Sequence, residues 1–412
     1  MRSSSMIYQL LKAASNTETE KIGERLSVSP DCAVLSHTSF DAVSRAMTTE
    51  QCALKTLAIN NHLPLKDGPS PESISTIQAK GVRYYAPGRA GMPALVVAEE
   101  GLAVPGSIIA GTDKNLLELG VLGSYVIHTD PKEMAALLNS GSMEIPVPAS
   151  FDIVLEGEPG EWVNGIDIAL FILKYYELPD DTSTCLEIYG DGLNRLSLPE
   201  RFNMVRVLVD FGYEHVLCQV DEQVIAFLQD RSTAEGKFYF PDTEKQPTSA
   251  TTIDLHSIHP MLAWKNDNIV HIGNLTDKDG VPVHQVFIGG DTACRFKDFE
   301  TGLKLVRYRP LFESVSAYIL PGSQLINSDL LNMGIASIFT EIGVDILPPA
   351  FLDSLATYPD TLWTRMGTSA QILQSGGMLA NALSCFSAAM TGKIIHPLEL
   401  ESILKQENSH KD

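Results

Sequence analysis

Three short apolar segments near the start of the chain end in polar residues, and this pattern constrains the fold more than any other feature. The segments are Cys32–Leu35, Leu57–Ile59 and Ser107–Ala110. Each has the length of a buried strand, and helix-like sequence usually follows the polar residues. Open α/β sheets bind ligands outside the carboxyl ends of their strands. The pattern therefore predicts an α/β fold with a binding site at the carboxyl edge of a sheet.

The same alternation of strand and helix continues along the chain, with no visible internal repeat. Further expected strands are Phe151–Leu155, Val286–Ile288, Val315–Leu320 and Val344–Leu347, and expected helices are Met6–Leu11, Gly165–Ile172, Lys297–Val306 and Ser328–Ile342. Such alternation predicts mostly parallel sheets. The polar stretch Asp230–Thr252 is typical of a linker. We expect three α/β domains, over residues 1–147, 148–243 and 244–412.

Composition excludes some classes of partner. The 412 residues carry a net charge of −21, which argues against nucleic acid or an anionic membrane surface, because both require clustered cations. No apolar run approaches the roughly 20 residues that span a bilayer. The six cysteines stand apart from one another, as reduced thiols of a cytoplasmic protein do. His256 and His259 form the one close histidine pair, but no third metal ligand follows at a recognisable spacing.

Two turns point to a family. The strand-like run His284–Ile288 breaks at Gly289–Gly290 and continues as Asp291–Arg295, and Pro348–Ala350 is followed by Phe351–Ser354. These turns resemble the two cluster-binding turns of the aconitase and 3-isopropylmalate dehydratase large-subunit family. The resemblance places the three cluster-ligand positions on Asp291, Phe351 and Ser354, so that no cysteine remains at any of them.

Other segments resemble the same family in order and spacing, from about Met6 to Pro397. They are Gly88–Gly91, Glu100–Ser107, Leu196–Arg201, Asp254–Leu255 with Pro260, Pro321–Ser323 and Thr364–Gly367. The resemblance implies an aconitase-like large subunit of three α/β domains. A fourth, swivelling domain of the family is absent from a chain of this length, which implies a small-subunit protein as partner.

The chemistry that the resemblance implies is the reversible loss and addition of water on a hydroxycarboxylate, with one iron of a [4Fe-4S] cluster as Lewis acid. Carboxylate, phenyl and hydroxyl side chains at the ligand positions are poor substitutes for thiolates. Cys294, three residues past the first position, could not replace all three. We therefore expect no cofactor, and in particular no [4Fe-4S] cluster on this donor set.

The family's acid/base residues are also changed. Its Asp-His pair falls on Asn60 and Asn61, a histidine falls on Ala94, and Asp-Ser-His becomes Asp113, Lys114 and Asn115. A carboxylate is retained as Asp210, while its asparagine neighbour becomes Arg206. Of two substrate-binding arginines, one matches Arg365 and the other falls on Asp360. His37 occupies a position that is polar in the family.

Most of the substitutes are polar, which favours a rebuilt site over a decayed one. Lys114 and Arg206 could replace the positive charge of the iron, and a histidine or Asp210 could act as base. We predict a cluster-independent lyase or isomerase acting on a small carboxylate. The predicted catalytic residues are His37, His62, Lys114 and Asp210, and the predicted substrate-binding residues are Asn60, Asn61, Asp113, Asn115, Arg206, Asp291, Arg295 and Arg365.

Three alternatives stay open. Ala94, Phe351 and Asp360 remove chemistry without replacing it, which favours a non-catalytic binding or regulatory partner of a small subunit. Lys114 and Arg206 could instead be ordinary solvated or ion-paired surface residues. A metal ion other than a cluster could use Asp291, Asp353 and His62, although nothing in the sequence fixes their geometry.

Overall fold

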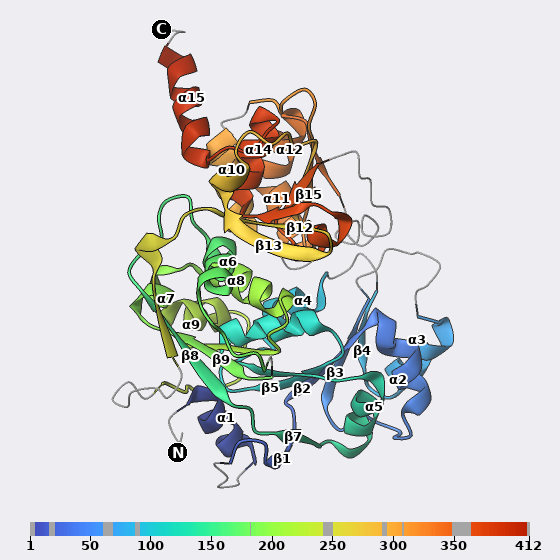
Figure 1. Cartoon of the computed structure of the whole chain (residues 1–412). Coiled ribbons are helices and arrows are strands. Elements are labelled where there is room, and N and C mark those ends of the chain that lie inside the picture. The colour runs from blue at the N-terminus through green and yellow to red at the C-terminus, as the bar shows by residue number, and fades with distance from the viewer. Residues whose placement is uncertain are drawn as a thin grey trace. The chain divides into compact units, whose positions relative to one another are not determined.

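The computed structural model describes residues 5–15, 21–60, 69–86, 91–181, 183–241, 250–290, 295–306, 309–347 and 364–409 (Figure 1). The chain divides into two compact units. The first comprises Met1–Glu156, Leu178–Leu198 and Leu208–Ile253, and the second comprises Gly157–Glu177, Pro199–Val207 and Asp254–Asp412.

The first unit contains a five-stranded parallel sheet of order β4-β3-β2-β5-β6. Its strands are β2 (Cys32–Ser36), β3 (Lys55–Ile59), β4 (Arg83–Tyr85), β5 (Ile108–Gly111) and β6 (Tyr125–His128). The chain builds outward from β2 through β3 to β4, and then returns to the other side of β2 for β5 and β6. The strand order therefore reverses between β2 and β5, which is the place where such sheets bind ligands.

Helices join these strands and bury their apolar faces on the sheet. They are α2 (Phe40–Ala46), α3 (Pro71–Ala79), α4 (Pro93–Glu99) and α5 (Pro131–Ser140), with the 3-10 helices η1 (His37–Ser39) and η2 (Lys114–Leu122). Leu35, Phe40, Ala58, Met134 and Leu138 pack in one fully buried cluster. Because β2 and β3 are covered in this way, they consist of almost continuous apolar sequence.

A four-stranded sheet of order β10-β9-β8-β11 completes the first unit, beside an antiparallel pair of β1 and β7. The strands are β1 (Arg25–Val28), β7 (Met143–Pro146), β8 (Ser150–Glu156), β9 (Cys185–Tyr189), β10 (His215–Cys218) and β11 (Ala250–Asp254). The helices of this part are α1 (Met6–Ser15), α7 (Asp191–Arg195), α8 (Leu198–Asp210) and α9 (Glu222–Gln229). Residues 199–207 of α8 belong to the second unit. The buried carboxylate of Glu187 accepts hydrogen bonds from the backbone N–H groups of Met6 (2.8 Å) and Ile7 (2.9 Å), which fixes the start of α1.

The second unit is built on a seven-stranded sheet of order β13-β12-β18-β17-β14-β15-β16. Its strands are β12 (Met261–Asn266), β13 (Ile269–Asn274), β14 (Gln285–Gly289), β15 (Ser316–Leu320), β16 (Val344–Ile346), β17 (Arg365–Gly367) and β18 (Met378–Ala380). Its helices are α6 (Gly165–Tyr175), α10 (Phe296–Val306), α11 (Gln324–Asn332), α12 (Ile335–Glu341), α14 (Ala382–Thr391) and α15 (Pro397–Ser409), with η3 (Leu255–Ser257), η4 (Leu275–Lys278) and η5 (Ala370–Ser375).

Five strands of this sheet repeat the order of the first one. The parallel set β16-β15-β14-β17-β18 corresponds strand for strand to β4-β3-β2-β5-β6, and the order now reverses between β14 and β17. The antiparallel strands β12 and β13 extend the second sheet at one side. Each unit therefore has one point of reversal where a binding site is expected.

The predicted α/β class is confirmed, and the predicted strands and most of the predicted helices are found. The single helix expected over Ser328–Ile342 is wrong, because Gly334 adopts a left-handed conformation (φ 72°) between α11 and α12. The expected linker also ends too late, since β11 begins at Ala250. Each predicted domain segment carries its own main sheet, although the chain groups into two units; the three-domain division stays a prediction. Among the described residues, no helix is long and apolar enough to cross a membrane.

Candidate functional site

Hydroxyl side chains gather where the first sheet reverses its strand order. Thr112, directly after β5, accepts a hydrogen bond on Oγ1 from the backbone N–H of Ser36 (2.9 Å). Its Oγ1 also lies 3.2 Å from Ser36 Oγ and 2.8 Å from Ser39 Oγ. Ser36 Oγ in turn lies 3.0 Å from Thr38 Oγ1, and Ser39 Oγ donates to the Ser36 carbonyl oxygen (2.8 Å). These four residues, Ser36, Thr38, Ser39 and Thr112, form the hydroxyl chain.

Counting protons gives the hydroxyl chain a direction. Each hydroxyl has one proton, and the carbonyl oxygen at the end of the chain can only accept. Ser39 therefore donates to the carbonyl, Thr112 to Ser39, Ser36 to Thr112 and Thr38 to Ser36. Thr38 is exposed and has no other hydrogen bond among the described residues. Its oxygen thus offers lone pairs to a ligand that donates a hydrogen bond.

Several predicted site residues lie at the same carboxyl edge. Ser36 pairs with Ile59 across β2 and β3, so His37 and Asn60 leave the sheet from neighbouring strand ends. His37 is half-buried, and Asn60 is buried with its side-chain Nδ2 3.4 Å from the Tyr84 hydroxyl oxygen. The structure therefore brings His37 and Asn60 next to the hydroxyl chain.

The segment after β5 supplies the next three predicted residues. Asp113 caps η2, because its carboxylate accepts a hydrogen bond from the Asn115 N–H (2.9 Å). Lys114 begins η2 and is exposed. Partial burial of the ring and the nearby ammonium group of Lys114 lower the pKa of His128 at the end of β6. Lys114 thus lies on the β6 side of the edge, with its charge open to solvent.

The other predicted residues of the first unit are placed less clearly. Asp210 is the exposed last residue of α8, and the chain then turns into the amino end of β10. Its role as a base stays a prediction. Asn61 and His62 lie outside the described residues, as do Asp291, Asp353, Phe351, Ser354 and Asp360 of the second unit.

The second unit repeats the hydrogen bonds of the first at its own reversal. Thr368, directly after β17, accepts a hydrogen bond on Oγ1 from the Gly289 N–H (2.8 Å), as Thr112 does from Ser36. The N–H of Thr368 donates to the Phe287 carbonyl oxygen and that of Thr112 to the Val34 carbonyl oxygen, both at 3.1 Å. The backbone and the threonine are therefore equivalent at the two edges.

Arg295 follows the second edge at the start of α10. Its guanidinium carbon lies 3.7 Å from the centre of the Phe202 ring, and its backbone N–H donates to Asp298 Oδ2 (2.8 Å). Asp298 Oδ1 accepts a hydrogen bond from Asn203 Nδ2 (3.3 Å). Burial raises the pKa of Asp298 to about 6 even though these hydrogen bonds lower it. The predicted binding residue Arg295 is thus held in place by an aromatic ring and a buried carboxyl group.

The two remaining arginines are buried. Arg206 lies on α8 one turn after Phe202, so both face the same side of that helix. Arg365 starts β17, where its Nε donates to Gln285 Oε1 (3.0 Å) at the amino end of β14. Arg365 therefore lies at the opposite end of the strands from Thr368. Its Nη1 also donates to the Ser375 carbonyl oxygen (3.5 Å), and its predicted role in substrate binding stays a prediction.

The described residues offer no set of ligands for an iron–sulfur cluster. Of the described cysteines, Cys32, Cys185, Cys218 and Cys385 are buried separately in strands and a helix, and burial raises the pKa of three of these thiols, Cys32, Cys185 and Cys385. Among the residues that the structure describes, no group of three His, Cys, Asp or Glu side chains could hold a metal ion. A donor set of Asp291, Phe351 and Ser354 would supply no thiolate.

Sequence reasoning missed the hydroxyl chain and Thr368. A usable signal was present: Gly111–Thr112–Asp113 recurs as Gly367–Thr368–Ser369, in each case where a short strand leads into a 3-10 helix. In both copies the third residue caps the helix with its side chain. A repeat of three residues is too short to indicate structural equivalence by itself, and its meaning follows only from the strand order that the two sheets share.

Comparison with known proteins places these features in a family. Residues 72–363 match the family described as "Aconitase family (aconitate hydratase)". The 3-isopropylmalate dehydratase large subunit of Acetivibrio thermocellus is 29% identical over 293 residues, covering 69% of each chain. That of Clostridium botulinum (strain Eklund 17B) is 24% identical and covers 95% of this chain and 98% of its own.

Among solved structures, aconitase X of Thermococcus kodakaraensis in its holo-form aligns with a TM-score of 0.48 at 10% identity, covering 90% of each chain. The match of the family pattern covers more than half of the sequence, and the resemblance expected from the two turns is confirmed. The chain belongs to the aconitase family.

Proposed function

We propose that this chain is a lyase or isomerase that acts on a small hydroxycarboxylate at the carboxyl edge of β2 and β5, without an iron–sulfur cluster. The observation that carries the proposal is the direction of the hydroxyl chain, which leaves the Thr38 oxygen as an acceptor for a substrate hydroxyl. The membership of the aconitase family and the dehydratase names of the relatives support the reaction class.

The neighbouring residues have complementary roles in this proposal. Lys114, exposed at the start of η2, binds a substrate carboxylate as a point charge. His37, beside the hydroxyl chain, removes the proton from the carbon next to that carboxylate. The carbanion is stabilised as the carboxylate bound to Lys114 takes up the charge. The electron pair then expels a leaving group or returns to a neighbouring carbon as a double bond moves.

The missing thiolates direct the choice of reaction. Hydroxide is a poor leaving group unless a metal ion binds it. The proposed reaction is therefore proton transfer with loss of a better leaving group, decarboxylation or movement of a double bond. The relatives are named as large subunits, and we propose that this chain also works with a small subunit that covers the edge.

Proton NMR in heavy water tests the proposal. The purified chain, with a small subunit where one is encoded beside it, is incubated with hydroxy-, keto- and unsaturated di- and tricarboxylates without added iron. We expect deuterium to enter a C–H position of one of them, or a new product signal. If no compound exchanges in the presence of the small subunit, the proposal is wrong.

Substitution of Lys114 assigns the activity to this edge. Lys114→Ala should abolish exchange, whereas Lys132→Ala, which removes another exposed lysine of the first unit from α5, should leave exchange unchanged. Because Lys114 is exposed, its loss should change the free energy of unfolding by less than about 0.5 kcal/mol. A fall in melting temperature with retained exchange would instead make Lys114 a structural residue.

A non-catalytic role is the second candidate, and one observation favours it. Ala94, at the position of a family histidine, is fully buried within α4. A helix core at this position supplies no acid or base. A protein of this kind would bind the small subunit or a carboxylate without exchanging protons, so retained binding with no exchange would favour this role.

A further inference from the structure

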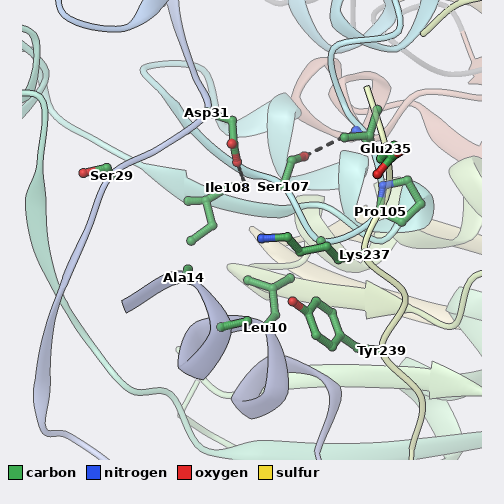
Figure 2. A pocket seen from close by; sticks show the side chains of 13 residues that line it. Leu10, Ala14, Ser29, Asp31, Pro105, Ser107, Ile108, Glu235, Lys237 and Tyr239 are labelled. Carbon is green, nitrogen blue, oxygen red and sulfur yellow. Dashed lines mark hydrogen bonds between the residues drawn. The ribbon is translucent and has the colours of Figure 1, made fainter. Parts of the chain in front are cut away.

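A cavity lies at the amino ends of the two strands whose carboxyl ends form the proposed site (Figure 2). Its volume is about 220 Å³, which suits a metabolite better than the drug-sized molecules of larger pockets. Asp31, directly before β2, and Ile108, the first residue of β5, both line it. The four residues of β5 separate this cavity from Thr112 by about 13 Å of strand.

One wall of the cavity is apolar and comes from α1. Leu10, Ala13 and Ala14 face the cavity along one side of that helix, and Val104, Pro105 and Ile108 continue the apolar lining. The helix is held by the bonds of its first N–H groups to Glu187, so this wall is fixed. Small apolar groups of a ligand can therefore be buried here.

Another wall is formed by an extended segment, residues 232–241, which follows α9. The backbone N–H of Lys237 donates to the Pro105 carbonyl oxygen (2.8 Å), and Gln9 Nε2 donates to the Phe240 carbonyl oxygen (2.8 Å). The ring of Tyr239 packs on the core of the unit. Figure 2 shows the side chains of Lys237 and Tyr239 reaching the cavity from this segment.

Opposite charges line the cavity without pairing with each other. Asp31 uses Oδ2 to accept a hydrogen bond from the Ile108 N–H (2.8 Å), and its other oxygen has no partner within the described part of the chain. Over the same residues, neither Lys237 nor Glu235 forms a side-chain hydrogen bond or ion pair. Two carboxylates and one ammonium group are thus presented to whatever enters.

We propose that this cavity binds an α-amino acid with a small apolar side chain. Its ammonium group faces Asp31 and Glu235, its carboxylate accepts hydrogen bonds from Lys237 and the Tyr239 hydroxyl, and its side chain lies against Leu10, Ala13 and Ala14. A ligand with one charge alone would leave part of this polar lining unpaired. The cavity shares β2 and β5 with the hydroxyl chain but none of its residues.

Calorimetric titration of the full chain with L-valine, isobutylamine and isobutyrate tests the proposal. The three probes share a branched apolar body and differ in carrying both charges, the ammonium group alone or the carboxylate alone. We expect L-valine to bind, and each single-charge analogue to bind roughly tenfold or more weakly, which corresponds to the loss of one good polar contact. No saturable heat with L-valine, or equal affinity for isobutyrate, would overturn the proposal.

Matched variants locate the binding. Lys237→Gln should weaken L-valine binding roughly tenfold, and Asp31→Asn should do the same while keeping an oxygen for the Ile108 N–H. Lys132→Gln serves as the surface control and should bind like the parent chain. Lys114→Ala should also leave L-valine binding unchanged, which separates this cavity from the proposed active site. If Lys237→Gln binds as tightly as the parent chain, the ligand does not occupy this cavity.

Discussion

The two points of strand reversal share a backbone but differ in the residue that ends the first strand. At the first edge this residue is Ser36, with φ −82°, and its side chain joins the hydroxyl chain. At the second edge it is Gly289, with φ 91°, and it has no side chain to offer. Thr112 and Thr368 make the same bond to both. The shared threonine therefore supports the fold, and the residue opposite it decides whether the edge can carry polar groups.

The glycine at the second edge is required by a close approach. A Cβ atom on Gly289 would lie 2.3 Å from the Leu320 carbonyl oxygen, where the first edge leaves room for a serine side chain. At the second edge the end of β14 thus lies directly against the end of β15. The first edge instead keeps side chains at the strand ends themselves.

Gly289→Ala should break the second edge and is the largest effect that we expect. A left-handed backbone and a backbone clash together should lower the free energy of unfolding by about 3–5 kcal/mol. Gly280→Ala is the control, because Gly280 has φ 77° but no atom within 4 Å of the added Cβ, so about 1 kcal/mol is expected. Urea unfolding followed by tryptophan fluorescence measures both. An equal loss of unfolding free energy in the two variants would mean that the backbone moves away from the Cβ added at Gly289 without an energetic cost.

Removing the two threonine hydroxyls sharpens the comparison. Thr368 is buried, so Thr368→Val leaves the Gly289 N–H without its acceptor and should cost about 1–3 kcal/mol. Thr112 is only half-buried, so Thr112→Val should cost less, about 1 kcal/mol or less. Thr112→Val should nevertheless impair deuterium exchange, because it interrupts the hydroxyl chain. Equal losses of stability with unchanged exchange would make both threonines purely structural.

The third expected effect is a pH dependence of stability to which a buried carboxyl group of the second unit contributes. Burial raises the pKa of Asp298 to about 6, above the 3.8 of an unfolded chain. The folded state then binds the proton more tightly, so the stabilisation is full below about pH 4 and is lost as the pH rises through 6. Asp298→Asn should therefore reduce the change in the free energy of unfolding between low and neutral pH by about 2–3 kcal/mol, which is the energy equivalent of the difference between the two pKa values.

Urea unfolding at several pH values measures that dependence. Asp279→Asn, which removes an exposed carboxylate from the same unit, is the control and should leave the slope unchanged. Asp167, another buried carboxyl group of this unit with a pKa raised by burial to about 7, remains in both variants. Glu187 of the first unit also has a pKa raised by burial to about 7, so a slope that survives Asp298→Asn would be assigned to Asp167 and Glu187 together.

Much of the fold could be predicted from the sequence because the central strands are buried on both faces. Residues such as Val34, Ala58 and Ile109 form continuous apolar runs, and the polar residues after them mark the carboxyl edge. The antiparallel strands β12 and β13 were not predicted, since their exposed ends carry mixed sequence such as Lys265 and Asn266. Hydrophobic periodicity gives no signal in such strands.

The candidate site could be predicted only in part. His37, Asn60 and Asp113 follow strands, so their common edge could be inferred. The hydroxyl chain could not be inferred, because two of its hydrogen bonds join Thr112 to Ser36 and Ser39, which lie 76 and 73 residues earlier in the sequence. The hydrogen bond from Arg365 to Gln285 likewise depends on strand pairing and could not be inferred from the sequence.

The fixed order of protons in the hydroxyl chain gives the first edge a chemical preference. Reversing the order would require the Ser36 carbonyl to donate, which it cannot do. An alcohol that approaches Thr38 finds an acceptor for its proton, whereas its methyl ether, equal in charge and nearly equal in shape, brings only a second acceptor. The first edge should therefore bind the alcohol more tightly than its methyl ether, because only the alcohol can donate a hydrogen bond to the Thr38 oxygen.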